Sequence, residues 1–157
     1  MTETPSDSHP PEGWRPFPIR DGFIGVNGPL FVRVEGEGIV VGMRVEARHC
    51  NPNSVCHGGM LMTFADMMLP IGARVAAKMP PVFLPTINLA MDYLAPAPLG
   101  VWIEGRARVL RVTRNLVFAD GVITADQTPV ARANGTFKIG KPLAELGRLD
   151  DLLAKPL

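Results

Sequence analysis

One long apolar segment constrains the fold of this chain more than any other feature. Residues 58–78 (GGMLMTFADMMLPIGARVAAK) are mostly apolar and rich in Ala, Leu and Met, which form helices readily. Their length and composition predict one buried helix. Its few polar residues are Thr63, Asp66, Arg74 and Lys78. Because Arg74 and Lys78 are four residues apart near the C-terminus, we expect them to mark a solvent-exposed face of this helix.

Segments with the two-residue period of β-strands flank this helix on both sides. Two strands are expected before the helix, from residue 30 onward. Four more are expected after it, separated by turn signals, at residues 86–93, 101–109, 116–124 and 130–139. An apolar helix followed by antiparallel strands predicts an α+β domain in which the sheet covers the helix. Residues 142–153 are expected to form a short helix.

The composition limits the class of protein. The 157 residues suit one domain, and 46% hydrophobic with 20% charged residues is a globular composition. A formal net charge of +1 lacks the basic excess of nucleic-acid binders, so no nucleic-acid partner is expected. No apolar run is long enough to span a membrane. Because the N-terminus carries no basic region followed by an apolar core, we expect a cytoplasmic protein.

The start of the chain differs from the rest. Five of the 16 prolines fall within the first 18 residues, which makes this stretch a poor helix or strand. We therefore expect residues 1–20 to form an extended tail, docked through Trp14 and Phe17. Residues 21–157 are expected to form a single domain.

The chain has two cysteines, Cys50 and Cys56, which are too few for a disulfide framework. We expect both to be reduced thiols. Neither a CxxC nor an HExxH pattern occurs in the sequence, so no metal-ligand spacing is recognisable. The expected protein therefore needs no metal and no cofactor.

Residues 51–66 (NPNSVCHGGMLMTFAD) carry the motif that bears on function. The matching elements are Asn51, the His-Gly-Gly triplet at residues 57–59, and Asp66 nine residues after the histidine. Here the sequence resembles the PaaI-like acyl-CoA thioesterases of the hot-dog superfamily. Residues 86–96 (TINLAMDYLAP) are similar to the third strand of that family.

The resemblance implies a hot-dog fold, in which an antiparallel β-sheet wraps around a long central α-helix. It also implies hydrolysis of an acyl-coenzyme A thioester to free acid and CoA, at sites shared across a dimer. Asn51, His57, Gly58 and Asp66 are the implied site residues. Thr86 matches the family position where a Ser or Thr hydroxyl helps to orient water.

The residue types themselves favour this chemistry. Gly58 and Gly59 leave the first N–H groups of the helix unobstructed, and these donors suit a thioester oxygen that gains negative charge. Asp66 lies two turns further on, among Met62 and other apolar neighbours, where a lone carboxylate is costly to bury. Such a carboxylate serves as a nucleophile or as a general base toward water, and the sequence leaves both roles open.

The length of the helix adds a constraint on assembly. Gly58 and Asp66 are eight residues apart, which is about 12 Å along a helix that rises ~1.5 Å per residue. One thioester carbonyl cannot lie within hydrogen-bond reach of both. If both residues act on one thioester, Asp66 of one copy must lie near Gly58 of another. We therefore expect a homodimer, or a tetramer built from dimers.

Some residues of the segment also have plainer interpretations. The His57 ring is expected to hold the loop, and Asn51 either orients the substrate or is an ordinary turn residue. Cys56 is not favoured as a nucleophile activated by the neighbouring His57, because the side chains of adjacent residues rarely point at each other. Pro70, one turn after Asp66, departs from the family pattern of a small residue. It is expected to kink the helix and to reshape the acyl pocket.

Substrate contacts are expected from two further groups of residues. Coenzyme A phosphates need cations, for which the candidates are Arg111, Arg114 and Lys138. Gly59 is also expected to contact the substrate. The acyl chain is expected among the apolar side chains of Met62, Phe83 and Leu84.

Two other functions stay open at this point. A hot-dog hydratase or dehydratase acts on similar thioesters, but such enzymes generally pair a catalytic His with an acid in motifs that this sequence lacks. A non-catalytic acyl-CoA-binding module would bind the ligand and release no thiol.

Overall fold

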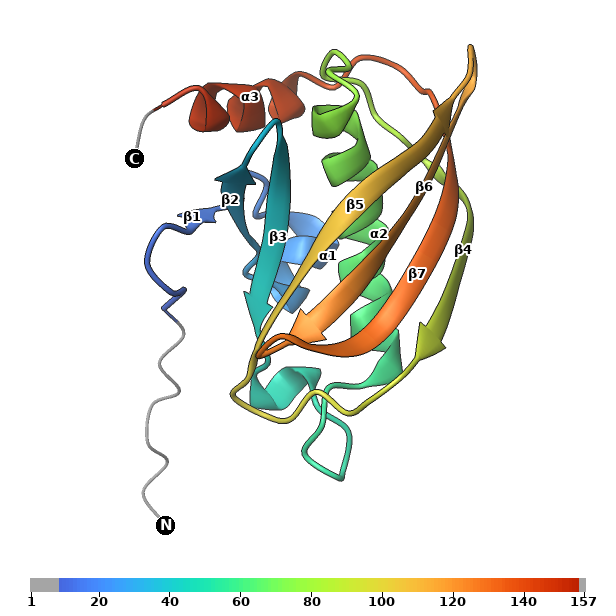
Figure 1. The fold of residues 1–157 in the computed structure, drawn as a ribbon. Helices are drawn as coiled ribbons and strands as arrows, with labels where there is room; N and C mark the ends of the chain where they lie inside the picture. Colours follow the sequence, from blue (N-terminus) through green and yellow to red (C-terminus); the bar gives the residue numbers. More distant parts are fainter. Residues whose placement is uncertain (1–8, 156–157) are drawn as a thin grey trace.

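A sheet of seven antiparallel strands wraps around one long helix in the computed structural model, which describes residues 9–155 (Figure 1). The strands are β1 (Arg15–Pro16), β2 (Phe31–Glu35), β3 (Gly38–Arg44), β4 (Thr86–Tyr93), β5 (Trp102–Val112), β6 (Leu116–Ala125) and β7 (Thr128–Lys138). The helices are α1 (Gly22–Asn27), α2 (Gly58–Ala76) and α3 (Gly147–Leu153), with 3-10 turns η1 (Ala47–His49) and η2 (Ala144–Leu146). The order across the sheet is β1-β2-β3-β5-β6-β7-β4.

The predicted central helix and the six predicted strands are confirmed, and α3 forms within the segment expected to be helical. The central helix ends two residues earlier than predicted, because Lys78 adopts a left-handed φ of 54° beyond the cap residue Ala77. Helix α1 was not predicted. Among the described residues, no helix is long and apolar enough to cross a membrane.

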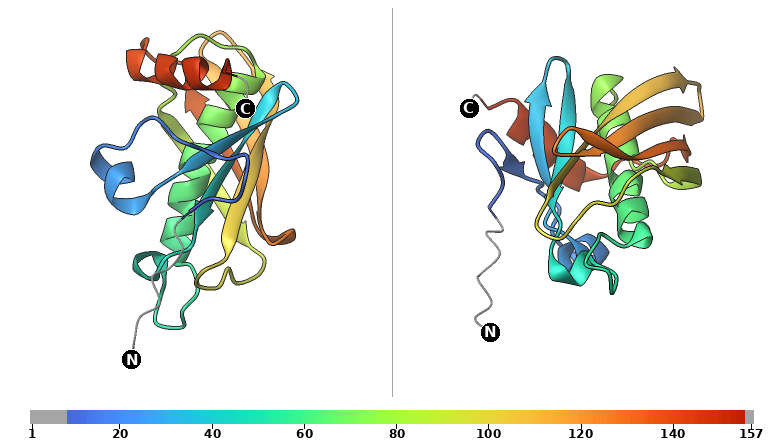
Figure 2. Two further views of the ribbon diagram at one scale, coloured as in Figure 1. Left: turned by 90° about the vertical axis from the view of Figure 1, so that its left-hand side faces the viewer. Right: turned by 60° about the horizontal axis from the view of Figure 1, so that its bottom comes forward.

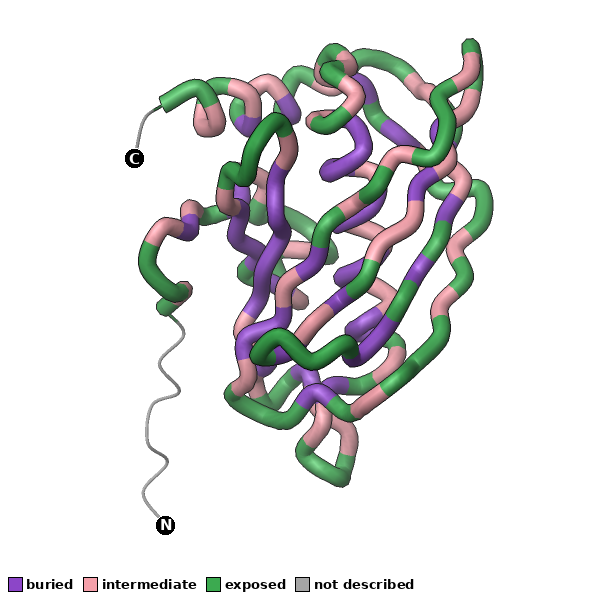
Figure 3. The backbone as a smooth tube through the Cα atoms, in the orientation of Figure 1, coloured by how far each residue is buried: buried purple, intermediate pink, exposed green. Residues whose placement is uncertain are grey.

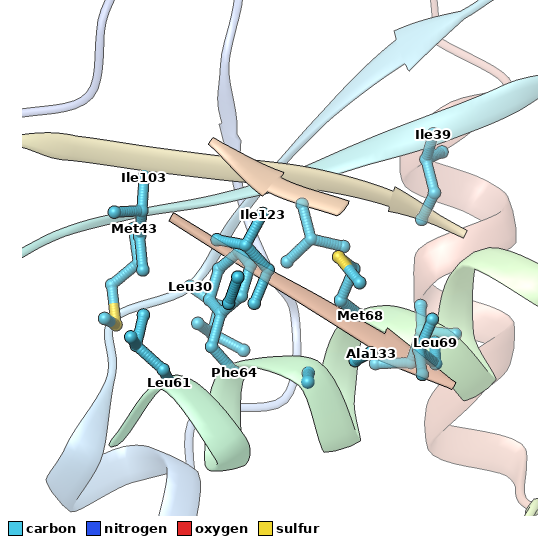
Figure 4. Close-up of a cluster of buried hydrophobic side chains, with 14 of the residues drawn as sticks. Leu30, Ile39, Met43, Leu61, Phe64, Met68, Leu69, Ile103, Ile123 and Ala133 are labelled. Atoms are coloured by element: carbon cyan, nitrogen blue, oxygen red, sulfur yellow. The ribbon is translucent and has the colours of Figure 1, made fainter. Parts of the chain in front are cut away.

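The apolar face of α2 forms the centre of the core. Figure 4 shows Leu61, Phe64 and Met68 directed from the helix toward Ile103 and Ile123 on β5 and β6. Phe64 and Met68 are fully excluded from solvent. Because burying a side chain of this size stabilises a fold by roughly 1.5–3 kcal/mol, this face holds α2 against the sheet.

Small residues let α2 approach the sheet closely. A Cβ on Gly72 of the helix would lie 2.8 Å from the Ala107 Cβ on β5. The Met68 side chain lies over Gly105 and Gly121, where added Cβ atoms would lie 2.2 Å from its Sδ and 2.9 Å from its Cε. Real Cβ atoms do not come this close to other atoms, so the spacing between helix and sheet depends on these glycines.

The two edges of the sheet differ in how far they are buried. On the outer face of β2 and β3, Val40 packs with Trp14, Phe31 and Trp102 in a second apolar cluster. At the opposite edge, β4 pairs only with β7 on one side and is mostly exposed, as Figure 3 shows. Figure 2 shows the sheet curving, so that β2 and β3 lie on one side of α2 and β4 on another.

The expectation that Arg74 marks a solvent-exposed face is wrong. Arg74 is 1% exposed, and its Nη2 lies 2.7 Å from Oδ1 of Asp150 on α3. Helix α3 crosses the C-terminal end of α2 and supplies this carboxylate (Figures 1 and 2). Lys78 is exposed, as predicted, and its Nζ forms an ion pair with Glu37 Oε1 at 3.0 Å.

Part of the expected N-terminal tail is packed against the sheet. Trp14 and Phe17 are buried, as predicted. The expectation that proline prevents a strand here is wrong over residues 15–16, which pair with β2 as β1. Proline is tolerated at the edge of a sheet, where its missing N–H breaks no ladder. Residues 1–8 of the expected tail lie outside the described residues.

Substitution of Gly121 tests the close approach of helix and sheet. Its added Cβ would lie 2.3 Å from the Arg106 carbonyl oxygen, a backbone atom, as well as against Met68. We expect Gly121→Ala to lower the free energy of unfolding by about 1–3 kcal/mol, measured by chemical denaturation. Gly147→Ala is the control, because its Cβ meets nothing within 4 Å. Equal stability of the two variants would contradict this account of the packing.

Candidate active site

Asp66 lies half-buried on α2 and is held by a hydroxyl group from β4. Thr86, the first residue of β4, donates its Oγ1–H to Asp66 Oδ1 at 2.5 Å. The sequence separates these residues by twenty positions, and the fold brings them together where β4 begins beside α2. The hydroxyl orients one carboxylate oxygen and leaves Oδ2 available to accept a proton from another molecule.

An apolar cavity of about 370 Å³ opens beside this pair. Asp66 and Thr86 line it together with Phe83 and Leu84, two of the three side chains that the sequence placed at the acyl chain. Pro70, one turn beyond Asp66 on α2, also lines this cavity. A largely apolar wall with a carboxylate and a hydroxyl at one place suits a ligand that is apolar except at its reacting end.

The N-terminus of α2 forms a separate part of the site. His57 is the N-cap residue, and its ring Nδ1 accepts a hydrogen bond from the Gly59 amide at 2.9 Å. The carbonyl of His57 accepts from the amides of Met60 and Leu61. Within the described residues, the Gly58 amide is left without a hydrogen-bond partner, so it is the donor available to a substrate oxygen.

Tyr93 was not singled out from the sequence, yet it lies against this helix terminus. Its hydroxyl donates to the Gly58 carbonyl at 3.0 Å, and a Cβ on Gly58 would lie 3.3 Å from its ring. It is the only tyrosine of the chain, and it lies in the strand whose sequence resembles the family. This position could have marked Tyr93 as a candidate site residue. A second hollow of about 370 Å³ is bounded by Gly58, Leu61 and Tyr93.

The structure therefore keeps the two chemical groups apart within one chain. Gly58 borders one hollow and Asp66 borders another, and none of residues 9–155 lines both. Their separation of eight positions corresponds to about 12 Å of helix. One thioester cannot contact the Gly58 amide and the Asp66 carboxylate of the same copy.

Other expected site residues lie further from these groups. Asn51 Oδ1 accepts a hydrogen bond from the Asn53 amide at 2.9 Å, which is the geometry of an Asx turn. Met62 is half-buried on α2 and does not line the cavity beside Asp66. Arg111 and Arg114 are exposed near the turn between β5 and β6.

Lys138 is exposed at the end of β7, and its amide donates to the Pro85 carbonyl at 2.9 Å. This bond places Lys138 next to the start of β4, where Thr86 meets Asp66. Among the three cations expected from the sequence, Lys138 is therefore the one whose backbone is hydrogen-bonded to Pro85, the residue before Thr86.

Thiol and metal chemistry have little structural basis in this site. Cys56 is buried, and its burial raises the pKa of the thiol to about 12, which disfavours the nucleophilic thiolate. Residues 9–155 contain no group of three or more His, Cys, Asp or Glu side chains arranged to hold a metal ion.

Comparison with known proteins identifies relatives of this chain. The family model described as "Thioesterase superfamily" matches residues 53–131. The Pseudomonas aeruginosa protein named "Putative esterase PA0474" is 32% identical over 130 residues, which cover 82% of this chain and 96% of that protein. Acyl-coenzyme A thioesterase 13 of Mus musculus is 26% identical over 99 residues, covering 63% of this chain and 69% of that protein.

A solved structure carries the same fold. The phenylacetic acid degradation protein PaaI of Thermus thermophilus superposes with a TM-score of 0.62 at 25% identity, covering 76% of this chain and 99% of that one. The expected hot-dog fold and the resemblance to PaaI-like proteins are thereby confirmed. The chain belongs to the thioesterase superfamily, and it is a thioesterase of the PaaI-like, hot-dog kind.

Proposed function

We propose that this protein hydrolyses an acyl-coenzyme A thioester to the free acid and CoA. The observation that carries the proposal is the Asp66–Thr86 pair at an apolar cavity. A carboxylate oriented by a hydroxyl suits attack on a carbonyl, and the cavity suits an apolar acyl group. The mouse relative named as an acyl-coenzyme A thioesterase supports coenzyme A as the carrier.

The chemistry needs two groups on opposite sides of the thioester carbonyl. The Gly58 amide and the α2 dipole stabilise the oxygen as it gains negative charge. Asp66 takes a proton from water while the water oxygen forms a bond to the carbonyl carbon. When the C–S bond breaks, the departing CoA sulfur takes up a proton, so the products are a carboxylic acid and a thiol.

A covalent route uses the same residues. Asp66 itself attacks the carbonyl carbon and expels the CoA thiolate, which leaves a mixed anhydride. Water then hydrolyses the anhydride to the free acid and the regenerated Asp66 carboxylate, and the proton that water releases converts the thiolate to the CoA thiol. In both routes Thr86 positions the carboxylate. Neither route needs a metal or a cofactor, so we propose that the enzyme uses none.

The site is proposed to form between two copies of the chain. The separation of Gly58 from Asp66 requires it if both act on one thioester. Strand β4 offers a surface for such an assembly, because it forms an edge of the sheet on which the large apolar side chains Ile87 and Tyr93 are more than half exposed. Exposed apolar strand edges are typical of surfaces that pair with another chain.

We propose Lys138, Arg111 and Arg114 as the cations that bind the CoA phosphates. All three are exposed, and all lie at the end of the sheet formed by the β5–β6 turn and the end of β7. Since Leu116 pairs with Lys138, the turn that carries Arg114 lies beside the lysine.

Asp66→Asn is the direct test of the catalytic carboxylate. An amide is neither a useful base nor a useful nucleophile, so turnover should fall by roughly 10²–10⁴, the range typical of general acid–base catalysis. Thiol release from acyl-CoA substrates measures this, and binding of an unreactive acyl-CoA analogue should change far less. Asp151→Asn, on the exposed side of α3, is the matched control. Turnover near the wild-type rate in a folded Asp66→Asn protein, or loss of activity on chelation, would contradict the mechanism.

A mixing experiment tests the shared site. Asp66→Asn and Gly58→Val proteins are each expected to be inactive, the second because a side chain at Gly58 would crowd Tyr93 and the donor. After mixing and subunit exchange, a hybrid dimer holds one site with both groups intact, so about a quarter of the wild-type activity should return with random two-fold pairing. An active monomer in light scattering, or no recovery after verified exchange, would overturn the shared site.

A further inference from the structure

The cavity beside Asp66 continues along α2 away from the reacting groups. Met67, Pro70, Ile71 and Arg74 line it on the same side as Asp66. Asp66 and Arg74 are eight residues apart, so this wall extends over about 12 Å of helix. The cavity is thus elongated and parallel to α2, with Asp66 at one end.

The chain's C-terminal segment lines the cavity at the end away from Asp66. Leu143 and Leu146, which follow β7, line it together with Val82. Val82 forms an isolated β-bridge to Pro142, and the Leu143 amide donates to the Pro81 carbonyl at 2.8 Å. Leu143 and Leu146, here called the closing residues, lie beyond residues 53–131, the part that matches the superfamily model.

An ion pair between the buried Arg74 and the partly exposed Asp150 holds this segment in place. Arg74 Nη2 and Nη1 donate to Asp150 Oδ1 and Oδ2 at 2.7 and 3.3 Å, and Nη1 also donates to the Met79 carbonyl at 3.3 Å. Because Arg74 is 1% exposed and already paired with a carboxylate, its charge is not free to bind an anionic ligand. The positive charge at this end of the cavity is therefore compensated by Asp150, and only Arg74 Nε lacks a hydrogen-bond partner there among the described residues.

We propose that this cavity holds the acyl group and selects uncharged chains of limited length, with Leu146 and Leu143 as the residues that set the limit. The inference rests on the proposed thioesterase function. An extended chain advances roughly 3.5 Å over three bonds, so 12 Å takes about ten bonds of an acyl chain. The volume of about 370 Å³ agrees with such a group, since a cavity of about 150 Å³ already accepts benzene.

A series of saturated acyl-CoA substrates tests the length limit. For wild-type protein, kcat/KM should rise by about fourfold per added methylene up to roughly ten carbons, as each group leaves water for the apolar cavity. It should then fall for longer chains. Hexanoyl-CoA should be hydrolysed at least about tenfold faster than adipoyl-CoA, which has the same length but buries a carboxylate. An equal rate for these two, or no decline up to sixteen carbons, would overturn the proposal.

Variants of the closing residues test their role. Leu146→Ala should move the optimum to longer chains, raising the tetradecanoyl to octanoyl ratio of kcat/KM by about tenfold. Leu143→Trp, at a half-buried position, should move the optimum to shorter chains. Leu149→Ala is the matched control, because Leu149 is fully buried on α3 but does not line the cavity. It should lower stability without moving the optimum.

The outcomes separate the two proposals. If wild-type protein hydrolyses no acyl-CoA, the proposed function fails. If it hydrolyses acyl-CoA substrates while both closing-residue variants keep the wild-type length profile, only the assignment of the cavity end fails. A shift caused equally by Leu149→Ala would show that the profile follows general loosening of α3, which also overturns the assignment.

A second feature, independent of the cavity, lies in the loop before α2. Cys50 and Cys56 face each other in an isolated antiparallel bridge. Hydrogen bonds flank them on both sides, from Asn51 N to Val55 O at 2.9 Å and from His57 N to His49 O at 2.8 Å. This pattern makes them a non-hydrogen-bonded pair, in which Cα atoms are about 4.5 Å apart, within the range that a disulfide spans.

We infer that Cys50 and Cys56, which are free thiols in the structure, form a reversible cross-strand disulfide. The Cys50 thiolate, the more exposed sulfur, attacks a low-molecular-weight disulfide and releases one thiol. The Cys56 sulfur then attacks the Cys50 sulfur of the mixed disulfide and releases the second thiol. The two cysteines lose two electrons and two protons, and the external disulfide gains them. The closed loop carries Asn51 and ends next to His57.

Oxidised glutathione is the probe for this disulfide. Incubation should lower the free thiol count of the denatured protein from two to zero and reduce the mass by two hydrogens, with full reversal by dithiothreitol. Burial raises the pKa of both thiols, so the rate should increase as the pH rises above neutrality. Cys56→Ser is the control and should stop at a glutathione adduct. A wild-type protein that keeps two thiols, keeps the adduct, or forms only intermolecular disulfides would overturn the inference.

Discussion

The burial of α2 against the curved sheet is the interaction on which the rest of the structure depends. Its apolar face occupies the centre of the core, and Gly105 and Gly121 allow Met68 to fit closely over the strands. The same helix carries the Gly58 amide at its first residue and Asp66 two turns further on. Because both residues lie on one continuous helix, their separation is set by the helical rise, at about 12 Å. The proposal of a site shared between two copies thus rests on the element that stabilises the fold.

The surroundings of α2 explain how one helix serves both stability and chemistry. Its sheet-facing side is dry and packed, whereas the side that carries Asp66 meets Thr86 and an open cavity. At its C-terminal end, Arg74 is buried because Asp150 of α3 compensates its charge. Breaking such a pair leaves an uncompensated buried charge, so the ion pair ties the closing segment of the cavity to the core.

Periodicity accounts for most of what could be predicted of the fold. The apolar run from residue 58 and the alternating strands after it are local patterns, and each formed where expected. The short strand at residues 15–16 and helix α1 carry no such pattern. Strand β1 lies between Trp14 and Phe17, which are buried against β2 and its neighbours, far away in the sequence. Helix α1 buries none of its own residues. The position of Arg74 was misjudged because its partner lies 76 residues away.

The sequence by itself determined the class of fold, the central helix, and the short motif that links Asn51, the His-Gly-Gly triplet and Asp66. These features depend on residue type and on spacing along one segment, which a sequence displays directly. Only the tertiary structure decided that Thr86 holds Asp66, that Tyr93 lies against Gly58, and that Leu143 and Leu146 line the cavity. These contacts join residues that are distant in sequence, and they exist only because the sheet wraps around α2 and brings its edge and its C-terminal extension to the helix.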